Sequence, residues 1–203
     1  MRLPSAFTLL ACGILFFAGC QSYDARLASR ETAYMNGQVT VHRPAAASGS
    51  GYDPISYWDG DNVSGSPSVK IFLSEQRAYF YKGDQLVGVS QISSGREGHN
   101  TPSGSFKIIQ KDADHVSTLY GDFVDGSDNV VKGNVAVGDP RPPGSHFKGA
   151  SMPHFMRIVG GVGMHAGFLP GYPASHGCIR MPAHMAEIFF NNVSTGTPVE
   201  LHN

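Results

Sequence analysis

Apolar and polar residues alternate along the segment between residues 68 and 110 and predict a series of short β-strands. Apolar side chains occupy every second position of 69–73, which is typical of a strand with one buried face. The segments 78–81 and 86–89 flank a short loop in which Gly83 permits the positive φ of a tight hairpin. A Pro/Gly turn then leads into a strand within 101–109.

The pattern changes in the second half of the chain. Residues 111–149 are the least regular, with short valine-rich segments compatible with strands, and we interpret them as an insertion. Strands are predicted at 152–159, around His165 and at 197–201. Residues 183–192 carry apolar residues at helical spacing after Pro182, which predicts a helix. The pattern therefore favours a mainly β domain with one helix near its end.

Residues 20–67 are predicted to be a tether or linker. The stretch 44–51 is rich in small residues without apolar periodicity, and turn-forming residues recur up to Pro67. Tyr57 and Trp58 are among the few aromatic exceptions, and they could pack on the outside of the domain or contact glycan.

The composition limits the classes of partner. The formal net charge of the 203 residues is −1, so no basic face supports nucleic-acid binding. The 25 glycines and 13 prolines favour a turn-rich β protein over a helical bundle. The length suits one globular domain with additional segments.

Residues 1–19 are predicted to be a lipoprotein signal peptide. Arg2 precedes an apolar run from Ala6 to Ala18, which has the length of a signal h-region and is too short for a permanent membrane span. Phe17-Ala18-Gly19-Cys20 resembles the lipobox of bacterial lipoproteins, in which the cysteine is acylated, although leucine is usual where Phe17 stands. A plain secretory signal is the alternative. The lipobox implies lipidation at Cys20, and Gln21 implies anchoring at the outer membrane, on the periplasmic face of the cell envelope.

The three cysteines then have separate expectations. Cys12 would leave with the signal and Cys20 would carry lipid, so Cys178 would remain unpaired. An unpaired cysteine in an exported protein is a liability unless it is reactive or deeply buried. Both readings stay open on the count alone.

The neighbourhood of Cys178 favours reactivity. Ser175-His176-Gly177-Cys178-Ile179-Arg180 brings together a hydroxyl, an imidazole, a thiol and a guanidinium, and His165 lies upstream. A thiol nucleophile needs a base, because free cysteine with a pKa of about 8.5 is only slightly ionised at neutral pH. It also needs donors for the oxyanion formed on attack at a carbonyl. Cys178 is thus the candidate nucleophile, His165 the candidate base, and the N–H groups around Gly177 and Cys178 the candidate oxyanion hole.

This motif resembles the signature of a known family. The Ser-His-Gly-Cys run, with a His-x-Gly at His165 and the Thr101-Pro102-Ser103-Gly104-Ser105-Phe106 element before it, is similar to the L,D-transpeptidase (YkuD-type) catalytic domain. The resemblance covers residues 68–203. It implies a mainly β fold, a YkuD-type sandwich of mixed sheets with a helix after the catalytic cysteine.

The resemblance also implies an activity. Cys178 would attack the amide after the meso-diaminoacyl residue of a peptidoglycan stem tetrapeptide, release D-Ala and form a thioester. An amine would resolve the thioester and give a cross-link or an attached lipoprotein, whereas water would make the protein a carboxypeptidase or hydrolase. The partners implied are peptidoglycan stem peptides, with the membrane reached through Cys20 and no cofactor required.

Residue roles follow from the same resemblance. The family assigns the base to His165 and lets the next carbonyl or side chain orient it, which here must be the Ala166 carbonyl because alanine has no polar side chain. Ser175 and His176 would shape the pocket, although His176, two residues from Cys178, could share its face on an extended segment. Arg180 could pair with a substrate carboxylate or make a structural salt bridge.

Other classes of function are less well supported by the sequence. The histidines around Cys178 could in principle bind zinc, but no H-E-x-x-H or C-x-x-C motif is present and no metal is expected. Thiol–disulfide exchange usually needs a resolving cysteine. A murein-binding lipoprotein without catalysis remains an alternative. Only nine residues separate His165 from Ser175, shorter than usual in the family, and residues 111–149 could be a lid over the site or a purely structural insertion.

Overall fold

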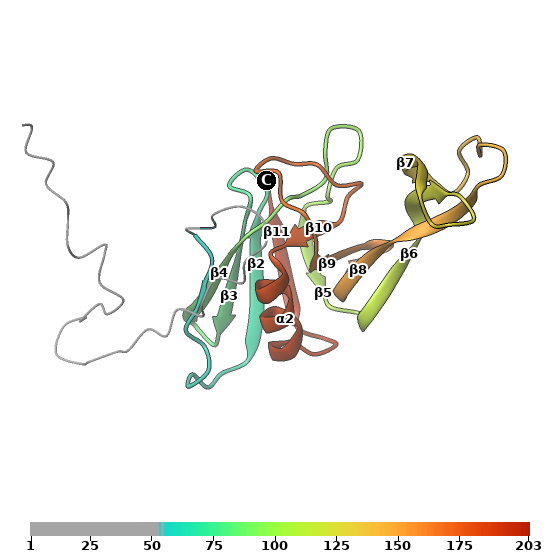
Figure 1. Cartoon of the computed structure of the whole chain (residues 1–203). Helices are drawn as coiled ribbons and strands as arrows, with labels where there is room; N and C mark the ends of the chain where they lie inside the picture. Colours follow the sequence, from blue (N-terminus) through green and yellow to red (C-terminus); the bar gives the residue numbers. More distant parts are fainter. Residues whose placement is uncertain (1–52, 54) are drawn as a thin grey trace, which may run out of the picture. The chain divides into compact units, whose positions relative to one another are not determined.

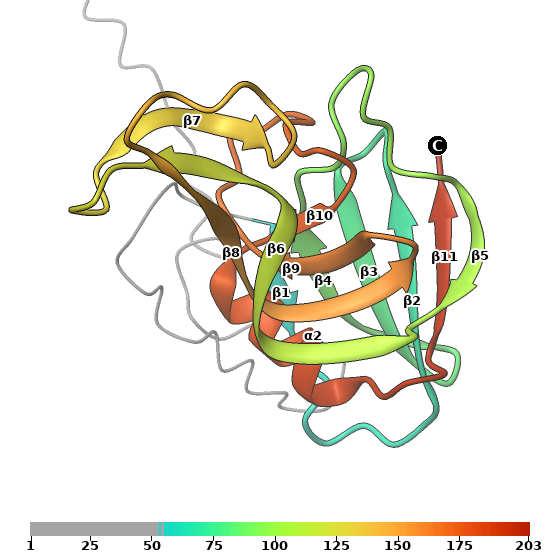
Figure 2. The ribbon, with the colours of Figure 1, turned by 90° about the vertical axis from the view of Figure 1, so that its right-hand side faces the viewer.

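The computed structural model describes residue 53 and residues 55–203. The predicted signal segment, Cys20 and most of the predicted tether lie outside the described residues. The described part contains one α-helix and two β-sheets (Figures 1 and 2). Its helix is not long enough to cross a membrane.

The first sheet has six strands in the order β1-β4-β3-β2-β11-β5. β11 runs parallel to β2, and the other neighbours are antiparallel, so the sheet is mixed. Its strands are β1 (Tyr57–Trp58), β2 (Pro67–Phe72), β3 (Arg77–Lys82), β4 (Gln85–Gln91), β5 (Gly104–Lys107) and β11 (Pro198–His202).

The second sheet has five strands in the order β10-β9-β8-β6-β7. β10 runs parallel to β9, while the remaining pairs are antiparallel. Its strands are β6 (Gln110–Val124), β7 (Val130–Ala136), β8 (His146–Val159), β9 (Val162–Ala166) and β10 (Ile179–Met181). Both views show the long strands β6 and β8 extending away from the core together, with β7 at their far end.

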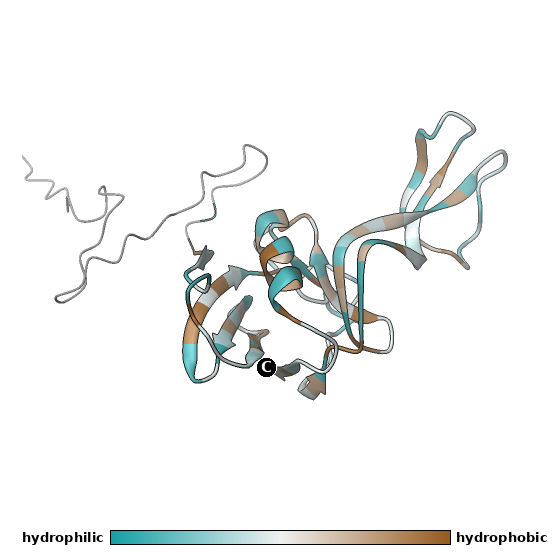
Figure 3. Ribbon diagram, turned by 90° about the horizontal axis from the view of Figure 1, so that it is seen from below, coloured by the Kyte–Doolittle hydropathy of each residue, from teal (hydrophilic) through white to brown (hydrophobic). Residues whose placement is uncertain are grey.

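The two sheets and helix α2 (Ala183–Asn192) share one hydrophobic core. Alternation of apolar and polar residues gives strands such as β2 and β3 a buried face, and Figure 3 shows hydrophilic and hydrophobic residues interspersed along the ribbon. Met185, Ala186 and Phe189 form the buried stripe of α2. The core residues come from both sheets and the helix, and include Val69, Ile71, Phe80, Met156, Ile158, Met164, Ile179, Met181 and Leu201.

The predicted fold class is confirmed, since the chain is mainly β with two mixed sheets and one helix. Helix α2 has the predicted bounds 183–192, and Gly83, with φ of 59°, lies in the predicted hairpin loop between β3 and β4. One difference concerns the predicted tether 20–67, because the sheet already begins at Tyr57 within it. Trp58 is buried in the core and its ring packs edge-on against Phe80.

Residues 111–149 are more regular than their sequence indicated. They form most of β6, all of β7 and the start of β8. Their backbone forms an antiparallel sheet, but many of their side chains are exposed. The sequence therefore shows little alternation between apolar and polar residues there. We call the outer part of this extension, residues 117–149, the arm.

Candidate active site

The candidate nucleophile Cys178 is the last residue of the loop that connects β9 to β10, and it lies immediately before β10. It is a free cysteine, half-buried, and its Sγ lies 3.4 Å from the carbonyl oxygen of Gly161 in the turn between β8 and β9. Burial raises the pKa of the Cys178 thiol, while the Gly163 N–H and the charges of Arg157 and Arg180 oppose that rise. The thiol is therefore protonated at neutral pH and depends on a base.

His165 lies on the neighbouring strand, β9. Its Nδ1 is 2.8 Å from the carbonyl oxygen of Ala166. A carbonyl oxygen can only accept a hydrogen bond, so Nδ1 carries the proton and Nε2 has the free lone pair. The ring is buried, and burial lowers the pKa of His165 to about 4, with the Ala166 contact opposing and the Arg180 charge adding to the effect. His165 is therefore neutral at pH 7.

Strand geometry places the side chains of His165 and Arg180 on one side of the second sheet. Met164 and Ala166 belong to the core, so His165 between them faces away from it. Arg180 is opposite His165 in the parallel pairing, and its neighbours Ile179 and Met181 are core residues. Cys178 precedes Arg180 by two residues. The imidazole and the guanidinium therefore lie on the same face of the sheet, and Cys178 directly precedes the strand that carries Arg180.

The turn that presents Cys178 is fixed by Ser175 and Gly177. The Ser175 hydroxyl donates to the carbonyl oxygen of Cys178 and accepts the Gly177 N–H at 3.0 Å. Gly177 has φ of 115°, a conformation that strongly favours glycine. Its N–H is occupied by Ser175, whereas the Cys178 N–H donates to no group among the described residues. Of the two N–H groups expected to form the oxyanion hole, that of Gly177 is thus already engaged by Ser175.

Residues 93–101 support this turn from the other side. Ser93 exchanges two backbone hydrogen bonds with Arg180, and Gly95 bridges to Ser175. The Thr101 hydroxyl donates to the Gly177 carbonyl oxygen at 2.8 Å and accepts the Gly95 N–H at 2.9 Å. A Cβ on Gly95 would lie 2.0 Å from the carbonyl oxygen of His99, so only glycine fits there. Thr101, the first residue of the Thr-Pro element that contributed to the resemblance, thus packs on the cysteine turn.

His176 points to a different set of neighbours from those of His165. Its Nε2 lies 3.0 Å from Arg96 Nη2, which must be the donor, so Nε2 is the acceptor of a neutral ring. Its ring stacks on Tyr120 with centroids 4.2 Å apart and contacts His99 edge-on at 4.7 Å. Burial lowers the pKa of His176, and the charge of Arg96 and the nearby His99 add to this. With Nε2 occupied, His176 is poorly placed to take a proton from Cys178.

Three residues of this site were not singled out from the sequence, namely Arg96, His99 and Tyr120. His99 is half-buried beside His176. Tyr120 comes from the arm, at an irregularity where β6 and β8 lose register between Val116 and Gly121. Thr101 had a signal as part of the Thr-Pro element, whereas the contacts of these three residues join segments distant in sequence.

The charges that act on the pKa of Cys178 are those of Arg157 and Arg180. Arg96 and Arg180 form no ion pair with any carboxylate in the described part of the chain, so the structural salt bridge considered for Arg180 is not seen there. Arg157 binds Gln110 Oε1 and the carbonyl oxygen of Gly160. Across residues 55–203, no group of three or more His, Cys, Asp or Glu side chains is arranged to hold a metal ion.

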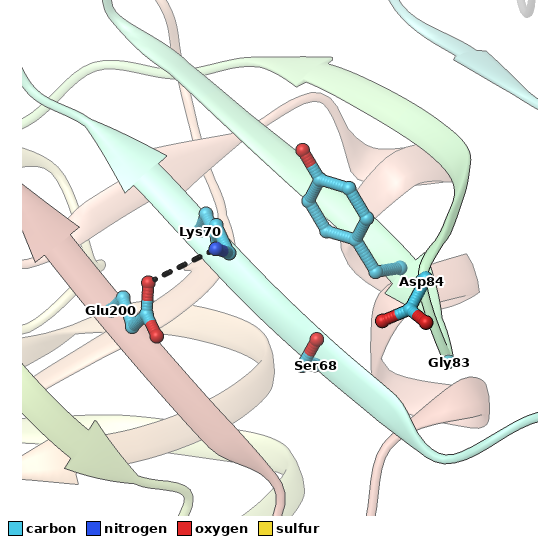
Figure 4. Close-up of a pocket in the computed structure, with 6 residues that line it drawn as sticks. Ser68, Lys70, Gly83, Asp84 and Glu200 are labelled. Carbon is cyan, nitrogen blue, oxygen red and sulfur yellow. Dashed lines mark ion pairs between the residues drawn. The ribbon is translucent and has the colours of Figure 1, made fainter.

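A separate hollow of about 320 Å³ lies on the outer face of the first sheet (Figure 4). Lys70 pairs there with Glu200 at 3.3 Å. None of the site residues predicted from the sequence lines it. The lining residues are Ser68, Lys70, Tyr81, Gly83, Asp84 and Glu200.

The fold and the site together define a mixed β-sandwich that carries a cysteine and a histidine on adjoining strands. A family model described as "L,D-transpeptidase catalytic domain" matches residues 66–201, about two thirds of the chain. The chain belongs to the L,D-transpeptidase catalytic domain (YkuD) family, as the motif indicated.

Solved structures show the same fold. An L,D-transpeptidase from Mycobacterium smegmatis is 19% identical with a TM-score of 0.53, and covers 68% of this chain and 59% of its own. L,D-transpeptidase 1 of Mycobacterium tuberculosis is 20% identical with a TM-score of 0.50, and the match covers 68% of this chain and 62% of that protein. The LD transpeptidase LdtMt1 in complex with imipenem is 20% identical with a TM-score of 0.52, covering 67% and 58%. The chain thus spans about three fifths of these proteins, and no curated protein sequence matches it.

Proposed function

We propose that this protein is a cysteine-dependent L,D-transpeptidase that acts on peptidoglycan stem tetrapeptides through a thioester acyl-enzyme. The observation that supports the proposal is the position of Cys178 directly before β10, the strand that pairs in parallel with β9 and its His165, within a domain of this family. The family match supports the peptidoglycan class of substrate.

The proposed chemistry uses both groups in their neutral forms. His165 Nε2 takes the proton from Cys178 Sγ as the sulfur attacks the carbonyl carbon of the amide that follows the diaminoacyl residue. The Ala166 carbonyl holds the Nδ1 proton, keeps the ring oriented and stabilises the imidazolium that forms. The pKa of His165 is lowered and the pKa of Cys178 is raised, and both shifts disfavour a thiolate–imidazolium pair. The proton therefore stays on the thiol until substrate binds.

The second half of the acylation step returns the proton. The oxyanion of the tetrahedral intermediate accepts a hydrogen bond from the N–H of Cys178. The intermediate then collapses and its C–N bond breaks. The imidazolium gives its proton to the departing amine of D-Ala, and the thioester remains on Cys178. An amine of a second stem peptide, or of a lipoprotein, then attacks the thioester carbon while His165 removes its proton, and the thiol is restored.

Hydrolysis is the second candidate outcome of the same acyl-enzyme. Water in place of the amine would make the protein an L,D-carboxypeptidase or an enzyme that detaches bound protein. A murein-binding lipoprotein without turnover is the non-enzymatic alternative. The Arg180 guanidinium, whose charge acts on Cys178 and which has no carboxylate partner among the described residues, favours an anionic peptide ligand in each case.

We also propose an anchored location. The lipobox-like sequence ending at Cys20 would give lipidation of that cysteine, and Gln21 would direct the protein to the outer membrane, facing the periplasm. The predicted tether would let the domain reach the peptidoglycan.

The proposed activity is tested by incubating the protein with purified muropeptides and identifying the products by mass spectrometry. Cross-linked dimers and released D-Ala are expected from the wild type, and neither from Cys178→Ala. Tripeptides without dimers would assign hydrolysis instead. Binding of muropeptides without any product from either protein would favour the non-enzymatic alternative.

A further inference from the structure

Arg96 is held rigidly beside the cysteine turn, although it lies about eighty residues away in sequence. Its backbone N–H donates to the carbonyl oxygen of Ser175 at 3.0 Å, and its Nη2 donates to His176 Nε2 at 3.0 Å. The side chain is therefore fixed at both ends.

His176 is itself fixed by aromatic contacts, which orient the guanidinium further. Tyr120 from the arm stacks on one face of the His176 ring at 4.2 Å with an interplanar angle of 15°. His99 packs against the same ring at 78°. An arginine normally loses much rotamer entropy when it binds a ligand, and these contacts reduce that cost because they order the side chain beforehand.

The second guanidinium of this region, Arg180, lies close to the first. Segments 93–96 and 175–180 run side by side, since Ser93 bridges to Arg180 and Gly95 to Ser175. Arg96 and Arg180 are close enough for the positive charge of one to lower the pKa of the other. Both are half-buried, and neither has a carboxylate partner among the described residues. Two partly desolvated guanidinium groups with free N–H donors fit a carboxylate, which satisfies both in charge and geometry.

We propose that Arg96 and Arg180 together form a carboxylate-binding site that takes the C-terminal carboxylate of the residue released from the donor peptide. This inference rests on the proposed function, since it names the part of the donor that the site recognises. In a tetrapeptide donor that carboxylate lies one residue beyond the scissile amide, or about 3.8 Å along the chain. Arg180 is correspondingly near Cys178, and Arg96 extends the site on the side of His176.

The test compares a stem tetrapeptide with the same peptide ending in a carboxamide. The second-order efficiency of acylation, which is the acylation rate constant of Cys178 divided by the apparent dissociation constant of the donor, is measured for both donors by intact-protein mass spectrometry. The wild type should prefer the free acid, and Arg96→Gln should reduce that preference by about 10- to 100-fold, the effect typical of a lost hydrogen bond to a charged group. Arg96→Lys should retain part of it, because the charge remains without the planar fork.

The matched control is Arg141→Gln, which removes the same charge at an exposed position in the loop between β7 and β8. It should leave the acid-to-amide preference unchanged. An equal fall for both donors in Arg96→Gln would overturn the inference, because Arg96 would then only position the loop. An unchanged preference would overturn it as well.

A second measurement separates this inference from the proposed function. N-acetyl-D-alanine should slow the alkylation of Cys178 by iodoacetamide, N-acetyl-D-alaninamide should not, and Arg96→Gln should remove the protection. This readout needs no turnover, so protection without transpeptidation would uphold the site and reject the proposed enzyme. Transpeptidation without a difference between the two ligands, or between the two donors, would reject the site and keep the enzyme.

Discussion

Arg180 lies directly opposite His165 in the parallel pairing of β10 with β9. The positive charge of this guanidinium adds to burial in lowering the pKa of His165 and opposes the burial that raises the pKa of Cys178. One side chain therefore favours a neutral base and an ionisable thiol at the same time.

Alkylation of Cys178 should depend on pH in a way that follows its raised pKa. The thiol with its raised pKa is protonated at neutral pH, so the rate with iodoacetamide should be low at pH 6 and still rising above pH 9. Rates are measured by intact-protein mass spectrometry on the folded protein. A plateau reached below pH 7 would contradict the prediction. In the same assay a carbapenem should give a stable mass adduct, and Cys178→Ala should give neither product.

His165→Ala should reduce acylation far more than His176→Ala. Proton transfer by a positioned base is typically worth about 100- to 10,000-fold, and only His165 has a free Nε2. His176→Ala removes a stacked ring and the acceptor for Arg96, so a smaller loss is expected. The acylation rates of both folded variants decide the ranking, and a larger loss for His176→Ala would reverse the assignment.

The buried neutral ring of His165 should make the fold less stable in acid. Its pKa is about 4 in the folded chain against an ordinary 6.5, so between these values the unfolded chain binds a proton that the folded chain does not. The free energy of unfolding should therefore fall as the pH drops from 6.5 towards 4, by up to about 3 kcal/mol. The loss levels off below pH 4.

Chemical denaturation of the wild type and His165→Gln between pH 4 and 8 measures this effect. The variant should show a flatter dependence on pH. Some dependence should remain, because the pKa of His176 is lowered as well. An identical slope for both proteins would show that His165 does not carry the linkage.

Thr101→Val should destabilise the fold and weaken the site together. The substitution keeps the shape but leaves the Gly177 carbonyl and the Gly95 N–H without their partner, at a cost of about 1–3 kcal/mol. Ser103→Ala is the matched control, because its hydroxyl binds Asn203 at the surface. Denaturation and acylation are compared for both. A Thr101→Val protein as stable and active as Ser103→Ala would refute this account of the loop.

The proposed lipid anchor is tested with Cys20→Ser. If the segment ending at Cys20 is used as a lipobox, the variant should accumulate as unprocessed precursor and lose labelling by a fatty-acid probe. Cys178→Ser is the control, since it should mature and be labelled normally. Normal processing and labelling of Cys20→Ser would exclude the anchor at that position.

The sequence predicted those parts of the fold in which local pattern and burial coincide. Helix α2 has one buried stripe, and β2 alternates buried Val69 and Ile71 with more exposed neighbours, so their periods are clear. The arm was not predicted as a sheet, because β7 has five exposed residues in succession and shows no alternation. Trp58 was placed outside the core, since a two-residue strand carries no period.

The candidate site was predictable only where its residues are close in sequence or belong to a motif. Cys178, Ser175 and Gly177 form one local turn, and the Nδ1 contact of His165 reaches only to the next residue. Arg96 and Tyr120 meet His176 through contacts that span 80 and 56 positions, and no local pattern encodes such pairs. The occupied N–H of Gly177 was also missed, because it depends on the rotamer of Ser175.

The place of β11 in the first sheet has a consequence for folding. β11 lies between β2 and β5, and Val199 pairs with Val69, roughly 130 residues earlier. Pairing over such a separation closes a long loop and is slow. β5 has no other neighbour in the described sheet, so it can join only after β11 has docked. Since Thr101 stands three residues before β5, we expect Cys178 to be among the last residues of the domain to reach its native surroundings.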